Sequence, residues 1–110
     1  MKENEMHQGY AAFLGRLDIP YRHDRTDKRT RTKLGEPDFL LTENGHCLFL
    51  ELKVLGGKIS PDQKKRHDYL RSKGNTVVVC YSLEECIEAT LTWREKIKLH
   101  HWAKGKADTI

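Results

Sequence analysis

Asp38, Glu51 and Lys53 are the residues of this sequence whose types and spacing are best suited to chemistry. The dipeptide Asn44-Gly45 lies midway between the two acids, and it is typical of the two-residue turns that close β-hairpins. Residues at equal distances from such a turn face each other, so Asp38 is predicted to lie directly opposite Glu51. Lys53 shares the face of Glu51, because side chains alternate along a strand. The pattern predicts two carboxylates and an ammonium group at one spot.

Two facing carboxylates of this kind can hold a divalent metal ion. Mg²⁺ prefers oxygen ligands and commonly binds one or two carboxylates together with phosphate oxygens and water. Asp38 and Glu51 would supply the carboxylates, and the backbone carbonyl of Leu52 would add a neutral oxygen. Phosphodiester cleavage also needs an oriented water and positive charge at the phosphate, and Lys53 is placed for both. We therefore expect a metal site suited to phosphodiester hydrolysis.

A cross-strand salt bridge is the structural alternative for the same residues. In an ordinary solvated hairpin, Lys53 would simply pair with either acid. Here Leu40 and Phe49 lie on the acidic face, and the opposite face is also apolar, so both faces are expected to be buried. Burying two facing carboxylates without a cation costs several kcal/mol. This cost favours the metal site.

The elements on either side are predicted from periodicity and capping signals. Apolar residues at helical spacing predict a first helix over residues 3–17. The hairpin strands are expected at 38–42 and 47–54, and Ser60-Pro61 marks the start of a helix that ends near Ser72. Residues 21–36 show little periodicity, which indicates a loop or an irregular edge strand.

The last third of the chain predicts one more strand and one more helix. Thr76–Tyr81 is a continuous β-branched run, and Ser82 begins a capping box for a helix that reaches about Leu99. Residues 103–110 are expected to fray. The strand–helix–strand unit requires a parallel crossover, so we expect a layered α/β domain with a mixed sheet flanked by helices.

Length and composition agree with a single small domain. The 110 residues suffice for one core, with the core elements within about 3–90 and a C-terminal helix and tail in 91–110. The net charge of +4 permits nucleic acid binding without requiring it. Three cysteines without metal-ligand spacing suggest free thiols in a reducing compartment. No signal-peptide or membrane-span pattern is visible, so a soluble, cytoplasmic location is expected.

Three segments carry a family resemblance. Gly35–Leu40 (GEPDFL), Glu51–Lys53 (ELK) and Gly57–Gln63 (GKISPDQ) resemble the VRR-NUC branch of the PD-(D/E)xK nuclease superfamily. The likeness covers about residues 3–90. PD…ExK alone is a loose pattern, whereas its combination with the preceding glycine and the Gly-x-x-Ser-x-x-Gln helix start is much more specific.

The resemblance implies a Mg²⁺- or Mn²⁺-dependent DNA endonuclease with a restriction-endonuclease-like αβββαβ core. It implies a further strand within residues 21–33. Asp38 and Glu51 would be metal ligands, with Lys53 as the catalytic lysine.

Two more site residues are implied by the resemblance, and each has a structural alternative. Gln63 would reach the active site from its helix start, but it is also the third residue of the Ser60 capping box. The family places an acid of the first helix at the metal, for which Glu5 fits best and Glu3 second. Glu5 otherwise contributes only favourable charge at a helix N-terminus.

Basic residues outside the hairpin suggest a surface for the DNA backbone, because contacts with phosphates supply affinity without reading sequence. Those expected to contact DNA are Arg22, Arg25, Lys28, Arg29, Arg31, Lys33 and Lys64. A solvated loop is the alternative for the segment 22–33. The pair His100-His101 near Trp102 is expected to be solvated rather than to bind metal.

The substrate and assembly follow from the resemblance. Standalone members of the family resemble Holliday-junction resolvases and act as homodimers, so branched or structured DNA is the expected substrate and a homodimer the expected assembly. A non-catalytic DNA-binding module on the same fold, or a restriction-like nuclease with sequence specificity, are the alternatives.

Overall fold

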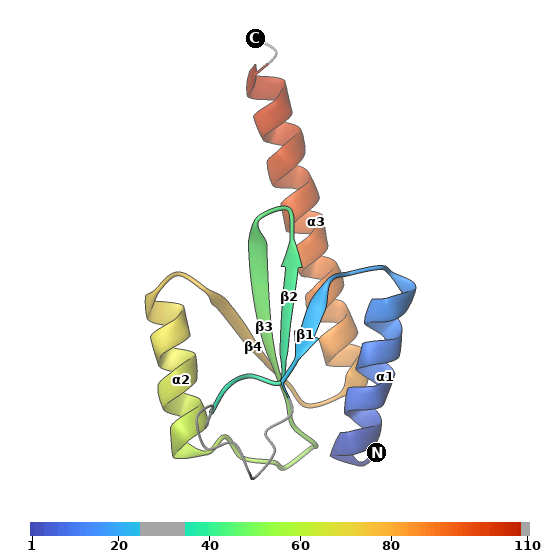
Figure 1. The fold of residues 1–110 in the computed structure, drawn as a ribbon, viewed down its shortest axis with the longest axis vertical. Helices are drawn as coiled ribbons and strands as arrows, with labels where there is room; N and C mark the ends of the chain where they lie inside the picture. The colour runs from blue at the N-terminus through green and yellow to red at the C-terminus, as the bar shows by residue number, and fades with distance from the viewer. Residues whose placement is uncertain (25–34, 109–110) are drawn as a thin grey trace.

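The computed structural model describes residues 1–24 and 35–108 (Figure 1). The elements in chain order are α1 (Glu3–Arg16), β1 (Tyr21–His23), β2 (Phe39–Glu43), β3 (His46–Leu52), α2 (Pro61–Ser72), β4 (Thr76–Cys80) and α3 (Leu83–Asp108). The expected αβββαβ order and its mixed sheet are confirmed. The strand implied by the family resemblance is β1, which the periodicity alone does not reveal.

The sheet is built around the predicted hairpin. Its order is β1-β2-β3-β4, with the first two pairings antiparallel and the pairing of β3 with β4 parallel. Phe39 pairs with Leu50 and Glu43 with His46, as equal spacing from the turn requires. Asn44 and Gly45 both have positive φ, 49° and 81°, as a type I′ turn demands. One more step in this register places Asp38 opposite Glu51.

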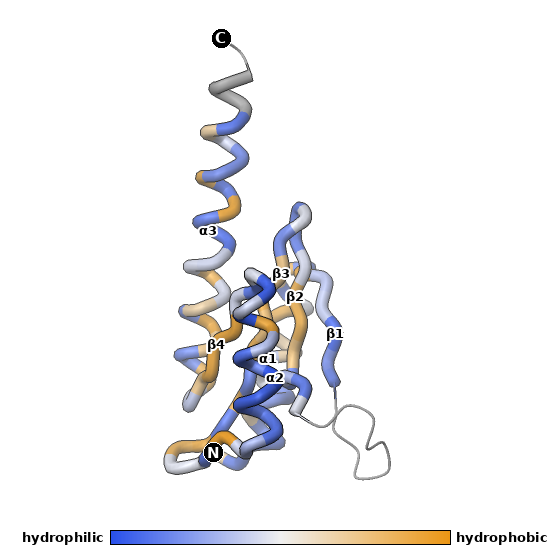
Figure 2. Tube along the Cα trace, turned by 90° about the vertical axis from the view of Figure 1, so that its left-hand side faces the viewer, coloured by the Kyte–Doolittle hydropathy of each residue, from blue (hydrophilic) through white to orange (hydrophobic). Residues whose placement is uncertain are grey.

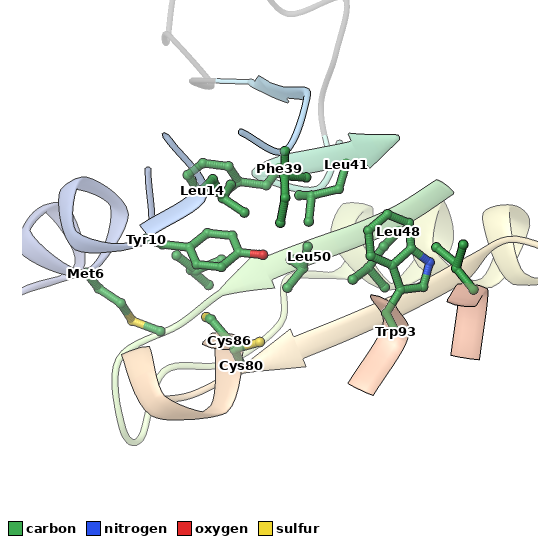
Figure 3. Close-up of a cluster of buried hydrophobic side chains, with 13 residues drawn as sticks. Met6, Tyr10, Leu14, Phe39, Leu41, Leu48, Leu50, Cys80, Cys86 and Trp93 are labelled. Atoms are coloured by element: carbon green, nitrogen blue, oxygen red, sulfur yellow. The ribbon is translucent and has the colours of Figure 1, made fainter. Parts of the chain in front are cut away.

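One face of the sheet is covered by α1 and α3. Leu50 of β3 is fully buried in a core to which α1 contributes Tyr10 and α3 contributes Trp93 (Figure 3). A hydrogen bond of 2.6 Å between the hydroxyls of Tyr10 and Thr90 joins the two helices. Side chains alternate along β3, so Glu51 faces the opposite side, where α2 packs. The sheet is therefore the middle of three layers.

The helix ends match their capping signals, with one exception. Ser60 and the third residue of α2 form the predicted capping box, and α2 ends at Ser72. Helix α3, in contrast, continues to Asp108 and corrects the prediction of an end near Leu99 followed by a frayed tail. No proline interrupts this stretch, so the helical hydrogen bonds can continue through it. The helix projects beyond the sheet, where it is mostly hydrophilic (Figures 1 and 2).

None of the helices within the described ranges, 1–24 and 35–108, combines the length and hydrophobicity that a membrane span needs. The three cysteines are free, with Cys80 and Cys86 buried in the core and Cys47 exposed.

Candidate functional site

The candidate site lies at the end of the sheet where β2 begins and β3 ends. Asp38 directly precedes β2 and is 8% exposed. Glu51 is the second-last residue of β3 and is 1% exposed. The loop before Asp38 packs closely against α2, because a side chain at Gly35 would clash with the backbone of Asp62. Gly35 also has a φ of +85°, which suits glycine alone. This close approach brings α2 to the two acids.

Asp38 is held by the backbone of β3. Its Oδ2 accepts a hydrogen bond of 2.8 Å from the N–H of Leu52. The N–H and C=O of one strand residue point toward the same neighbouring strand. The carbonyl of Leu52 therefore points to the side of Asp38, and its role as a neutral oxygen ligand stays a prediction.

Glu51 is a strongly perturbed carboxyl group. Burial, followed by a hydrogen bond and charge repulsion from Asp38, raises its pKa to about 9, against a smaller opposing effect of the nearby Lys53. In the absence of a cation, Glu51 thus retains its proton at neutral pH. Such a carboxyl is stabilised in its ionised form by an added positive charge.

On the face of the sheet that α2 covers, Glu51 contacts His67 of α2. Its Nε2 lies 3.2 Å from Glu51 Oε1, and the His67 residue is 2% exposed. The distance alone would also fit an ion pair. However, burial lowers the pKa of His67 and raises that of Glu51, so we assign a hydrogen bond between two neutral groups. This bond orients the Glu51 carboxyl group.

The first turns of α1 add two further groups. His7 Nε2 lies 3.6 Å from Asp38 Oδ2 and 3.8 Å from Glu3 Oε1. One ligand atom from each of these three residues lies within 4.8 Å of the others. The charge of Glu3 also contributes to the raised pKa of Glu51.

The structure thus brings Glu3 to the site, and it leaves Glu5 exposed outside this cluster. The physical reason is the helical rotation of about 100° per residue, which turns Glu5 about 200° away from Glu3. The structure therefore favours Glu3, the second choice from the sequence, over Glu5 as the acid that the first helix brings to the site.

Lys53 lies near Glu51, whereas the side chain of Gln63 caps α2. Lys53 is half-buried directly after β3, close enough to Glu51 to lower the pKa of its carboxyl. Gln63 serves the cap of α2: its side-chain oxygen accepts from the N–H of Ser60 at 2.9 Å, and its own N–H donates to Ser60 Oγ at 3.1 Å. The capping alternative for Gln63 is confirmed, and its oxygen is committed to the backbone.

Only two of the predicted DNA-contacting residues lie in the described part of the chain. Arg22 pairs with Asp24 at 3.1 Å, and Lys64 pairs with Asp68 at 3.1 Å, both on the surface. The others, Arg25, Lys28, Arg29, Arg31 and Lys33, lie outside the described residues. His100 and His101 are exposed, as expected.

Two histidines of the site were missed by the sequence reasoning. His7 follows Glu3 by four residues and His67 follows Gln63 by four, so each lies on the same helix face as a residue already considered. This four-residue spacing from the candidate residues was the signal that could have identified the two histidines.

Comparison with known proteins identifies the fold. No family model and no curated protein matches this chain. Among solved structures, it is similar to one described as a VRR_NUC domain protein, with a TM-score of 0.69 and 23% identity over 83% of this chain and 86% of the other. A second, described as a VRR_NUC domain, gives a TM-score of 0.63 and 24% identity over 78% and 90%. The chain has the fold of VRR-NUC domains, consistent with the restriction-endonuclease-like fold.

Proposed function

We propose that this chain is a nuclease that hydrolyses DNA phosphodiester bonds with the help of a divalent cation. The observation that carries the proposal is the pair of facing carboxylates, Asp38 and Glu51, buried at the sheet end beside Lys53. The fold of VRR_NUC domains supports a nuclease as the class of protein.

The residues at the site fit Mg²⁺ or Mn²⁺. Hard divalent cations bind carboxylate and carbonyl oxygens, which Asp38, Glu51, Glu3 and the Leu52 backbone would provide. Burial and Asp38 raise the pKa of Glu51, and a bound cation would favour the ionised form of this carboxyl group. A bound cation would supply positive charge at the scissile phosphate and at the attacking water.

The remaining residues position these groups and supply charge. The Leu52 N–H fixes Asp38, and His67 fixes Glu51, so neither carboxylate has to be ordered when substrate arrives. The Lys53 ammonium group is placed to orient a water and to stabilise negative charge that develops on the phosphate. Burial of Asp38 and Glu51 strengthens these electrostatic effects, because less water screens them.

Branched or structured DNA is the proposed substrate, and a homodimer the proposed assembly. The basic segment 22–33, with Lys64, would follow the DNA backbone through phosphate contacts. Two nicks at a junction need two sites, and residues 1–24 and 35–108 provide one pair of facing acids. These proposals rest on the family resemblance and on the concentration of Lys and Arg in that segment.

The test uses Asp38→Asn and Lys53→Ala, with Lys98→Ala on the exposed face of α3 as a matched lysine control. Nicking of a plasmid and of a four-way junction is measured with Mg²⁺ or Mn²⁺, and again with EDTA. The two site variants should fold and bind DNA but lose cleavage by about a hundredfold or more, whereas the control cuts like the unmodified chain. Full cleavage by both site variants would contradict the assignment.

Substrate and assembly are tested separately. A panel of duplex, flap, splayed-arm and junction DNA should show the fastest cleavage on branched forms, and sedimentation should give the mass of a dimer. Metal-independent binding without cleavage of any substrate would instead indicate a non-catalytic DNA-binding module. Cleavage of duplex DNA at one recurring sequence would indicate a restriction-like nuclease.

A further inference from the structure

We propose that His7 supplies a nitrogen ligand to the cation held by Asp38 and Glu3, and that His23 positions the His7 ring for this role. The inference rests on the proposed function, because it concerns the same cation. It goes beyond that function by adding a histidine to a ligand set that is otherwise oxygen only. It also predicts which cations the site prefers.

The distances around His7 Nε2 fit a shared ion. Its separations of 3.6 Å from Asp38 Oδ2 and 3.8 Å from Glu3 Oε1 exceed hydrogen-bond lengths. Ligands about 2.1 Å from an octahedral ion lie about 3.0 Å apart when adjacent and about 4.2 Å apart when opposite. Both separations from His7 Nε2 fall between these two values, and small adjustments of the side chains would bring the three groups onto one ion.

The other nitrogen of the His7 ring already has a partner. His7 Nδ1 lies 2.8 Å from His23 Nε2, a hydrogen bond that requires one of the two nitrogens to carry a proton. If His7 Nδ1 donates, Nε2 keeps its lone pair and is directed at the two carboxylates. Histidine ligands commonly donate their second nitrogen in this way, which fixes the tautomer and the ring orientation.

His23 is itself held in place by the sheet. It lies directly opposite Phe39 in the pairing of β1 with β2, and the two rings stack with centroids 4.1 Å apart and an interplanar angle of 6°. The His7 ring is 5.7 Å from the same Phe39 ring. The short strand β1 thus has a specific use, since it places a hydrogen-bond partner behind the histidine of α1.

A nitrogen ligand has a consequence for the choice of cation. Imidazole binds transition metals such as Mn²⁺ and Co²⁺ better than it binds Mg²⁺, which favours oxygen. The site should therefore bind Mn²⁺ more tightly than Mg²⁺, and His7 should account for part of that preference. Replacing His7 by Gln should lower the Mn²⁺ affinity by about tenfold or more and change the Mg²⁺ affinity much less.

The direct test is pulsed electron paramagnetic resonance of Mn²⁺ bound to the full chain without DNA, which detects a coordinated nitrogen independently of activity. The unmodified chain should show nitrogen coupling that shifts when its histidines carry a different nitrogen isotope. His7→Gln should lose the coupling, and His101→Gln, on the exposed face of α3, should keep it. Absence of nitrogen coupling in the unmodified chain would overturn the proposal without any variant.

Two further measurements separate the possible outcomes. Asp38→Asn should abolish the specific Mn²⁺ signal; if the unmodified chain binds no Mn²⁺ that depends on Asp38, the proposed function fails as well. Mn²⁺ bound through Asp38 without nitrogen coupling overturns only the role of His7. His23→Phe keeps the stacking on Phe39 but removes the acceptor, so it should lower the ratio of Mn²⁺ to Mg²⁺ affinity. An unchanged ratio would refute the positioning role of His23.

Discussion

The buried carboxyl of Glu51 predicts how the stability of the cation-free protein depends on pH. Burial and Asp38 raise the pKa of this group from its ordinary value of 4.5 to about 9. Between these two values the folded chain keeps a proton that the unfolded chain has lost. The contribution of Glu51 to stability is therefore complete below about pH 4.5 and is lost as the pH rises toward about 9.

The magnitude follows from a difference of one proton. Over the interval in which only the folded chain holds that proton, the free energy of unfolding falls by about 1.4 kcal/mol per pH unit. The sign is opposite to that of a carboxylate in a salt bridge, whose pKa is lowered and which stabilises the protein at higher pH. The alternative of a simple Lys53 salt bridge thus predicts no such fall.

Two other groups with shifted pKa values determine the pH range in which the effect of Glu51 on stability is best measured. Burial lowers the pKa of His67, so this residue makes the stability increase with pH, but only up to about pH 6.5, where histidine in the unfolded chain loses its proton. The raised pKa of the Cys86 thiol adds a fall in stability above about pH 8.5, where unfolded thiols ionise. Between about pH 7 and about pH 8, Glu51 is therefore the main contributor.

The assay is urea unfolding in EDTA at about pH 7 and about pH 8, for the unmodified chain and for Glu51→Gln. The unmodified chain should lose about 1.4 kcal/mol more than the variant, because glutamine cannot titrate. Added Mn²⁺ should reduce this loss, since a bound cation favours the ionised carboxylate. Equal losses in the two proteins without cation would refute the claim that Glu51 is buried in its protonated form.

Further predictions concern the loop before β2 and the acid of α1. Gly35→Ala should destabilise the fold by about 3 kcal/mol or more, because it combines positive φ with a clash, whereas Gly45→Ala, with positive φ in open space, should cost about 1 kcal/mol. Equal losses in thermal or urea unfolding would show that the loop is not packed tightly against α2. Glu3→Gln should weaken Mn²⁺ binding in calorimetry by about tenfold, and Glu5→Gln by less than about twofold. A larger effect of Glu5→Gln would restore Glu5 as the site acid.

The hairpin was predictable from sequence because its determinants are local. A two-residue turn at Asn44-Gly45 fixes the pairing of every residue up to Asp38 and Glu51, with no information needed from distant parts of the chain. The capping box at Ser60 is local in the same sense. The position of α2 over Glu51 was visible only through the family resemblance, since it depends on the contact between Gly35 and Asp62.

The elements that the pattern missed depend on distant contacts. Strand β1 has three residues, of which two are exposed, so alternation carries no signal there. It exists because Tyr21 pairs with Leu41 and His23 with Phe39. The part of α3 after Leu99 is the other missed element, because the helix continues to Asp108, past the last residue that the pattern assigned to it.

The choice between Glu3 and Glu5 required the rotation of α1 about its own axis, and the sequence contained that information. Met6, Tyr10 and Leu14 are the buried residues of α1, and they recur every four residues. Glu3 precedes Met6 by three residues, so it lies in line with this stripe at the N-terminal end of α1. Glu5 is adjacent to Met6 and lies about 100° away from the stripe. An acid in line with an apolar stripe faces the same layer of the fold as the stripe does. Here that layer is the sheet, and Asp38 lies at the end of it that Glu3 approaches. The spacing between an acid and the buried residues of its helix therefore indicates which layer of the fold that acid faces.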